Sequence, residues 1–260
     1  MRNGRSPAFR FGVGATTFAA LAVGWYIATT ATHFLPQVYF PMPAEVGQAF
    51  RQIAIRGYAD GKLYQHFLHS CWLVLMGFTA AVSIGIPLGM LMGWSRRAEA
   101  LVNPAFLLLR PIPPLAWIPL AIVWLGLGDA AKVLVIWFAA FVPAVINSYA
   151  GVRAIEPHLI EAARSLGIGR TMLVREVLFP GALPLIFTGL RLSLQACWTT
   201  LVAAELIGAI VGLGHVLYQA GLDLFPAMIV VGMMGVAVAG GLMTLALGWL
   251  EARSMPWRAR

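Results

Sequence analysis

The feature that most constrains this chain is a series of long apolar runs that recur from one end to the other. They cover residues 11–35, 67–94, 106–127, 130–150, 185–211 and 226–250. About 20 apolar residues in a helix cross the hydrocarbon core of a bilayer. Such a run must be helical in lipid, because its backbone groups find no water to bond. The sequence therefore predicts an all-α integral membrane protein with about six transmembrane helices.

The balance of residue types excludes a soluble domain. Hydrophobic residues make up 60% of the 260 residues and charged residues only 11%, and a soluble fold of this composition would expose large apolar patches. The net charge of +8 does not indicate nucleic-acid binding, because the arginines are scattered between apolar runs and form no continuous patch. We therefore predict that the chain contacts membrane lipid and no nucleic acid.

The positive charges also predict an orientation. Bacterial membrane proteins retain Lys and Arg on the cytoplasmic side. With both termini on that side, only four of the 18 basic residues fall outside: Arg51, Arg56, Lys62 and Lys132. The pattern predicts a multi-pass protein of the bacterial cytoplasmic (inner) membrane with both termini cytoplasmic.

Residues 1–66 are predicted to hold one transmembrane helix and an external amphipathic segment. Three arginines precede the first apolar run: Arg2, Arg5 and Arg10. That run is longer than the roughly 7–15 apolar residues of a signal peptide, so we expect it to be retained. Val46, Phe50 and Ile53 then recur at helical spacing, which indicates a short helix at the outer surface. Residues 67–260 form the predicted five-helix core.

Prolines crowd the first half of the third run. They are Pro111, Pro113, Pro114 and Pro119. Each lacks an amide and frees a carbonyl of the preceding turn. Freed backbone groups cannot face lipid, so we expect this stretch to be buried in protein or to line a cavity.

One long polar stretch, residues 156–184, lies within a predicted cytoplasmic loop over residues 151–184. Pro157 suits the first turn of a helix. That helix is expected to reach Ser165 and stop near Gly167, where glycine takes a left-handed turn. A second helix over about residues 171–178 is expected to end at Pro180.

Two short helices held outside the bilayer favour docking to a partner. Ala162 and Ala163 supply small side chains where two backbones approach, and Glu161 is placed to pair with an arginine of that partner. The alternative is a solvated hairpin with internal pairs such as Glu161–Arg164, each worth only a few tenths of a kcal/mol.

The same stretch carries a specific motif. Glu161-Ala162-Ala163 is followed, after three residues, by Gly167 and, after nine more, by Val177-Leu178-Phe179-Pro180. This resembles the EAA loop of binding-protein-dependent ABC importer permeases, E-A-A, three residues, G, nine residues, I-x-L-P. Val177 stands for Ile and Phe179 for Leu, and both remain apolar.

Two further stretches are similar to the branch of that family that handles nitrate, sulfonates and taurine. They are RPIPPLAWIPL at 110–120 and LVAAEL at 201–206. The resemblance covers nearly the whole chain, more weakly before about residue 60. It implies a type I ABC importer permease fold and a coupling role for Pro157, Glu161, Ala162, Ala163, Gly167 and Pro180.

The resemblance also implies partners and a solute. The partners are a second copy of this chain, two separate ATPase subunits that hold ATP and Mg, and an external solute-binding protein. No cofactor is expected on this chain. The branch implies taurine or an aliphatic sulfonate as the solute, with nitrate, bicarbonate, an aromatic acid or a thiamine precursor left open.

No catalytic or metal-binding constellation stands out. The stretch nearest to a phosphate-binding loop, GYADGKL at 57–63, has the wrong spacing and lacks Ser or Thr after Lys62. The chain is therefore predicted to be a permease without its own ATPase. His66 and His69 are interpreted as interfacial packing rather than metal ligands, and Cys71 and Cys197 as buried free thiols.

Glu205 is the clearest ionisable residue deep in an apolar run. It must face the interior of the bundle or water. Its role is that of a gate on the transport path, or of an anchor between helices, or it lies close to the outer interface. In the first role it would also suit an ion-coupled secondary transporter, the alternative function.

Other polar residues of this run have open roles. Four residues offer hydrogen-bond donors and an aromatic surface to a pore: Gln195, Trp198, Thr199 and Thr200. Arg191 is expected either to reach lipid phosphates or to pair with Glu176.

Overall fold

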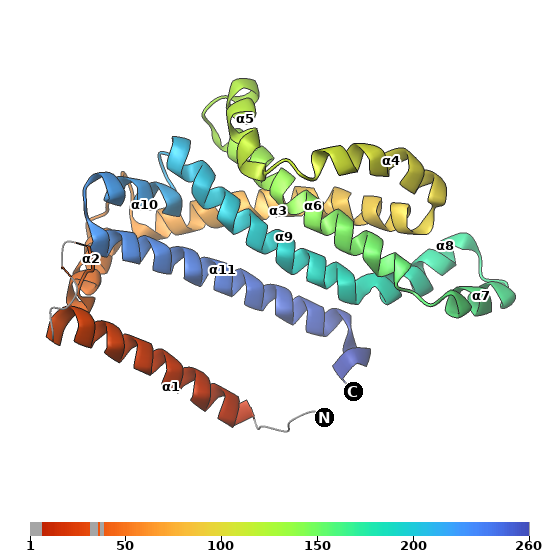
Figure 1. Cartoon of the computed structure of the whole chain (residues 1–260), viewed down its shortest axis with the longest axis horizontal. Helices are drawn as coiled ribbons and strands as arrows, with labels where there is room; N and C mark the ends of the chain where they lie inside the picture. Colours follow the sequence, from red (N-terminus) through yellow and green to blue (C-terminus); the bar gives the residue numbers. More distant parts are fainter. Residues whose placement is uncertain (1–6, 32–35, 37–38, 260) are drawn as a thin grey trace.

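The computed structural model describes residues 7–31, 36 and 39–259, and their long helices confirm the predicted all-α membrane fold (Figure 1). Five helical segments there are long and apolar enough to cross a membrane, or up to six if one bent pair counts as a span. Their main helices are α1 (Pro7–Tyr26), α3 (Leu63–Trp94), α6 (Asp129–Arg153), α9 (Phe179–Gly208) and α11 (Pro226–Ser254).

The predicted third span is the bent pair. Helix α4 (Arg96–Leu109) and a short 3₁₀ turn (Pro114–Trp117) that leads into α5 (Ile118–Leu125) meet at 83°. Pro111 and Pro113 cannot continue a helix, so the chain turns there. This elbow is exposed in the single chain. This single chain does not bury the elbow, so the expected setting, burial in protein or a cavity, stays a prediction.

Helices α3, α6 and α9 form the centre of the fold. Buried side chains from all three, among them Leu73, Ile136 and Leu201, share one core cluster. Small residues recur every fourth position on the α3 face toward α6: Gly77, Ala81, Gly85, Gly89 and Gly93. In membranes such residues let two helix backbones approach closely. This ridge, which the sequence analysis missed, sets the contact between α3 and α6.

Gly89 gives a first testable prediction. A Cβ at this position would lie 2.4 Å from the Val145 carbonyl oxygen of α6. Gly89→Ala should therefore push α3 and α6 apart and cost about 1–3 kcal/mol. The control is Gly47→Ala on an exposed helical turn, where a Cβ has nothing within 4 Å. The measurement is thermal unfolding of the purified protein; equal effects of the two substitutions would contradict the ridge.

The two ends of the bundle differ. Helix α7 (Pro157–Ser165) and the turn α8 (Arg170–Leu173) project from one end, here called the hairpin end, and α2 (Pro43–Ile55) and α10 (Leu213–Leu222) lie at the far end (Figure 1). Helix α1 begins and α11 ends toward the hairpin end (Figure 1). Arg2, Arg5, residues 32–35 of the first run and Arg260 lie outside the described residues. The division at residue 66 stays a prediction.

Helix α2 confirms most of the amphipathic pattern. Val46 and Ile53 are buried and pack against Val216 and Met228 of α10 and α11. Phe50, expected on the same buried face, is 52% exposed. It lies at the edge of the helix, where it borders a groove between α3 and α11.

The second helix of the polar stretch is longer than predicted. Instead of ending at Pro180, α8 runs through a π-helical turn (Val174–Leu178) directly into α9. Phe179 donates its amide to the Val174 carbonyl five residues earlier, and Pro180 follows where α-helical geometry resumes. A proline is tolerated in such a first turn. The fifth span therefore begins before the predicted residue 185.

Candidate functional site

The hairpin end carries the predicted coupling segment, and its first helix has the predicted bounds. Glu156 has an extended backbone, and Pro157 opens α7. At the other end Gly167 has φ +75°, and the amide of Ile168 donates to the Ala163 carbonyl at 3.3 Å. Glycine closes the helix there because a left-handed residue lets the following amides reach back.

The surface of α7 separates the two alanines of the motif. Glu161 and Ala162 are exposed, whereas Ala163 is only 6% exposed and packs within the chain. Of the other predicted coupling residues, Pro157 and Gly167 are exposed and Pro180 is half-buried. Large apolar side chains also stand free on the hairpin: Leu159, Leu166 and Met172. Apolar side chains beside a carboxylate suit a protein partner better than a solvated surface.

The hairpin is anchored to the ends of the membrane helices. Ile160 of α7 packs in a cluster with Trp94 of α3, Leu178 and Ala182. Arg164, the expected partner of Glu161 in the solvated alternative, instead lies over the Trp94 ring at 5.6 Å from its centroid. Helix α7 therefore contacts the ends of both α3 and α9.

Ion pairs tie other helices together toward the hairpin end. Arg153 of α6 pairs with Glu99 of α4, whose carboxylate also accepts the Tyr149 hydroxyl at 2.5 Å. Arg191 of α9 pairs with Glu251 of α11. Of the two expectations for Arg191, pairing with Glu176 is wrong, because Glu251 of α11 is its partner, and contact with lipid phosphate stays a prediction.

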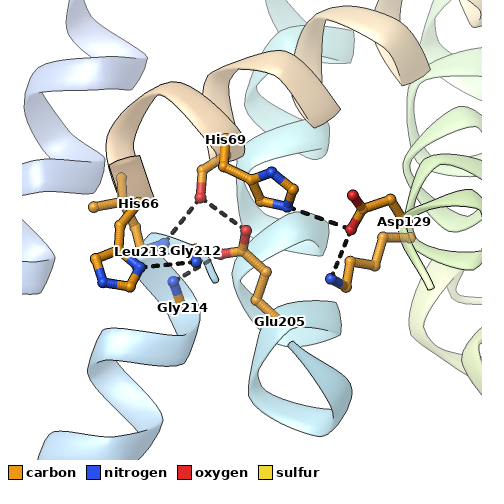
Figure 2. Close-up of polar contacts among 9 residues, drawn as sticks. His66, His69, Asp129, Glu205, Gly212, Leu213 and Gly214 are labelled. Carbon is orange, nitrogen blue, oxygen red and sulfur yellow. Dashed lines mark hydrogen bonds and ion pairs between the residues drawn. The ribbon is translucent and has the colours of Figure 1, made fainter. Parts of the chain in front are cut away.

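A second polar cluster surrounds Glu205 near the far end (Figure 2). Glu205 is 1% exposed and accepts two hydrogen bonds, from the Ser70 hydroxyl of α3 and from the amide of Gly214, each at 2.7 Å. The two carboxylate oxygens thus accept hydrogen bonds from two other helices, α3 and α10. Glu205 of α9 thereby connects α3 with the start of α10.

The same cluster holds the start of α10 by side chains. Successive amides donate to side chains of three residues: Gly212 to His66 Nδ1 at 3.0 Å, Leu213 to Ser70 Oγ at 2.9 Å, and Gly214 to Glu205. The first amides of a helix have no partner within it. Here α3 and α9 supply those partners, so they fix where α10 begins.

The two histidines serve this packing. The Nδ1 of His66 accepts from an amide, and its Nε2 lies 3.0 Å from the Tyr58 carbonyl, so the ring proton is on Nε2. His69 lies 3.3 Å from Asp129, which also binds Lys132 (Figure 2). Over the described parts of the chain, no three such side chains gather as metal ligands do.

Tyr58, in the loop between α2 and α3, makes another contact at the far end. Its hydroxyl donates to Asp223 at 2.5 Å. Burial, followed by this hydrogen bond, raises the pKa of Tyr58. The loop before α3 is thereby joined to the end of α10.

The structure divides the predicted pathway residues of α9 into two groups. Gln195 and Thr199 are exposed, and the Thr199 hydroxyl bonds back to the Gln195 carbonyl at 3.1 Å. The other three, Trp198, Thr200 and Glu205, are buried. These three buried residues therefore do not lie on the same exposed surface as Gln195 and Thr199. Cys71 and Cys197 are free, as predicted, although Cys71 is only half-buried.

Sequence reasoning missed the partners of Glu205. Ser70 is one small polar residue among many, and the stretch from Gly212 to Gly214 reads as an external loop. The sequence held one signal, the two glycines Gly212 and Gly214 at the start of a helical run. The structure gives the reason for the first of them, because a Cβ on Gly212 would lie 2.2 Å from Glu205 Oε1.

A family model described as "Binding-protein-dependent transport system inner membrane component" matches residues 85–255. The taurine transport system permease protein TauC of Escherichia coli (strain K12) is 38% identical over 242 residues, 93% of this chain and 88% of that protein. A putative aliphatic sulfonates transport permease protein of the same strain is 35% identical over 246 residues, 95% and 89% of the two chains.

Two further similarities extend this result. The bicarbonate transport system permease protein CmpB of Synechococcus elongatus is 34% identical over 197 residues, 75% of this chain and 71% of that protein. A chain of the MetNI methionine ABC transporter has a TM-score of 0.65 at 22% identity, covering 74% of this chain and 95% of that chain. The last similarity concerns the fold alone. The family match and these relatives show that this chain belongs to the binding-protein-dependent transport system inner membrane components, the permeases of ABC importers.

Proposed function

We propose that this permease carries a small anionic solute, taurine or an aliphatic sulfonate, through the membrane by alternating access. The observation that carries the proposal is the exposed α7 hairpin with its E-A-A motif, in a chain similar over most of its length to taurine and sulfonate permeases. A bicarbonate permease is among the relatives, so other small anions are the competing solutes.

The function requires partners. ATP hydrolysis is done by a separate subunit, which holds ATP and Mg, and a second copy of this chain completes the membrane part. The exposed proline elbow between α4 and α5 supports the second copy, because its freed backbone groups need protein or water. Two ATPase subunits and an external solute-binding protein complete the importer.

We place the hairpin end in the cytoplasm, with both termini. ATP binding brings the two ATPases together, and α7 moves with them. Because α7 packs on α3 and α9, the membrane helices then open outward, and hydrolysis returns them inward. Each state must be favoured by differential binding of nucleotide or binding protein.

The alternative, an ion-coupled carrier that uses Glu205, is not favoured. A coupling carboxylate must gain and lose its ion in contact with water during each cycle. Glu205 is 1% exposed and both oxygens accept protein donors. The exposed hairpin also has no role in such a carrier.

The experiment is reconstitution of the permease with its ATPase and binding protein in vesicles. We expect uptake of radiolabelled taurine or ethanesulfonate that needs all three proteins and ATP, and ATP hydrolysis stimulated by the loaded binding protein. Uptake by the permease alone, driven by a proton gradient, would instead establish the carrier function.

A further inference from the structure

We propose that the exposed face of α9 lines the path of the solute, and that the side-chain amide of Gln195 is a hydrogen-bond donor that the anion meets there. The inference rests on the importer function and assigns a solute contact to one residue. It concerns the middle of the membrane, since Gln195 lies near the centre of α9 (Phe179–Gly208).

Five exposed residues in the middle and second half of α9 form one continuous face, which the exposed Arg191 borders. They recur at spacings of three, four or seven residues: Thr188, Leu192, Gln195, Thr199 and Leu206. Residues at this spacing share one side of a helix. The opposite side, with Ser193, Cys197 and Leu201, is buried in the core.

Hydrocarbon is a poor environment for this face. The Gln195 amide makes no side-chain hydrogen bond within the described chain, and an unpaired amide in lipid is strongly unfavourable. Helix α11 gives the contrast, because one exposed face of it holds apolar residues at matching spacing, Val238, Leu242, Leu245 and Trp249. The exposed Thr244 lies on another side and donates its hydroxyl to the Gly240 carbonyl. We assign the apolar face of α11 to lipid and the mixed face of α9 to water in the path.

The charges around this face allow an anion to bind weakly and to be released again. The acidic residue of α9, Glu205, points away into the cluster near the far end. Arg191 is neutralised by Glu251 of α11. The hydroxyls of Thr188 and Thr199 donate to the Pro184 and Gln195 carbonyls of their own helix. The face therefore offers one neutral donor to an anion, the Gln195 amide, and no uncompensated cation. Neutral dipoles hold an anion weakly enough for release, as a transport path requires.

The first test measures access to this face. Gln195→Cys is made in the full importer, with Cys71 and Cys197 replaced by alanine. We expect Gln195→Cys to react with the impermeant 2-sulfonatoethyl and 2-trimethylammonioethyl methanethiosulfonates. The ratio of the reaction rates, sulfonate reagent over trimethylammonium reagent, should be about tenfold higher at Gln195→Cys than at the exposed matched control Gln52→Cys on α2. The reason is that a path selective for anions concentrates them.

Two results would overturn the proposal. Leu245→Cys, on the lipid face of α11, should not react; if Gln195→Cys is equally inert, the face is covered by lipid or by the second copy. If the two reagents react in the same ratio at Gln195→Cys as at Gln52→Cys, the face is accessible to water but does not select anions, which contradicts the proposal.

The second test changes the donor. Gln195→Glu adds a like charge and should lower sulfonate uptake by at least about tenfold, whereas Gln195→Asn keeps the amide and should retain uptake within about twofold. Equal uptake by the two variants contradicts the proposal. Stimulated ATP hydrolysis by the unsubstituted complex is measured in parallel, because its absence would refute the importer function instead.

Discussion

Replacing Ala162 by tryptophan is expected to release the ATPase from the permease. Ala162 is exposed on α7 beside Glu161, where the proposed partner backbone approaches. A large side chain at such a contact costs about 1–3 kcal/mol, which weakens binding by roughly 5- to 150-fold. The measurements are copurification of the ATPase with the permease and hydrolysis stimulated by the binding protein.

The matched control is Ala44→Trp, an exposed alanine on α2 at the far end. Because no ATPase contact is expected there, copurification should be unchanged. Full copurification and stimulation with Ala162→Trp would show that α7 is not the coupling element, and the proposed mechanism would lose its main support.

Gly167 tests the same hairpin through its backbone. A Cβ at Gly167 would meet nothing within 4 Å, so its φ of +75° is the only obstacle to a side chain. Gly167→Val should therefore disturb the hairpin, since β-branched residues are strongly disfavoured there. Gly167→Asn should be mild, because asparagine tolerates this conformation. If Gly167→Val and Gly167→Asn reduced ATPase copurification equally, a side-chain contact and not the backbone conformation would be what matters at this position.

The second large effect is expected for Glu205→Ala. This change leaves the Gly214 amide and the Ser70 hydroxyl without their acceptor in a buried site. Each unsatisfied group costs about 1–3 kcal/mol, and the lost side chain leaves a cavity. We expect a low yield of folded protein and a clear fall in its unfolding temperature.

Glu205→Gln separates an anchor from a coupling carboxylate. The glutamine oxygen can accept from Gly214 and its amide can donate to the Ser70 oxygen, so the fold should largely survive. We expect near-normal yield and near-normal uptake. Normal yield with abolished uptake would show that the charge itself takes part in transport, contrary to the anchor.

Much of the fold was predictable because its signals are local. An apolar run long enough to cross a bilayer reports a helix without reference to any other segment. Pro157 and Gly167 likewise mark the start and end of α7 through their own backbone preferences. The prolines after α4 marked an irregular third span, but the 83° bend there was not predicted.

Local signals failed where two geometries compete over a few residues. Pro180 reads as a helix end, but the π-helical turn before it lets the chain continue into α9. The alanines of the motif are neighbours in sequence and chemically identical, yet one is exposed and the other is buried. Only the rotation of α7 against Trp94 and Leu178 decides which.

By itself the sequence determined the class of protein, its series of long apolar helices and the position of the exposed hairpin. The tertiary structure decided what each polar side chain of α9 faces. Glu205 meets Ser70, which is 135 residues away in the chain, while Gln195 on the same helix is exposed. Helical spacing shows which residues share a side, but the packing of α3, α6 and α10 sets which side is buried. That packing depends on contacts between distant segments, which no local pattern contains.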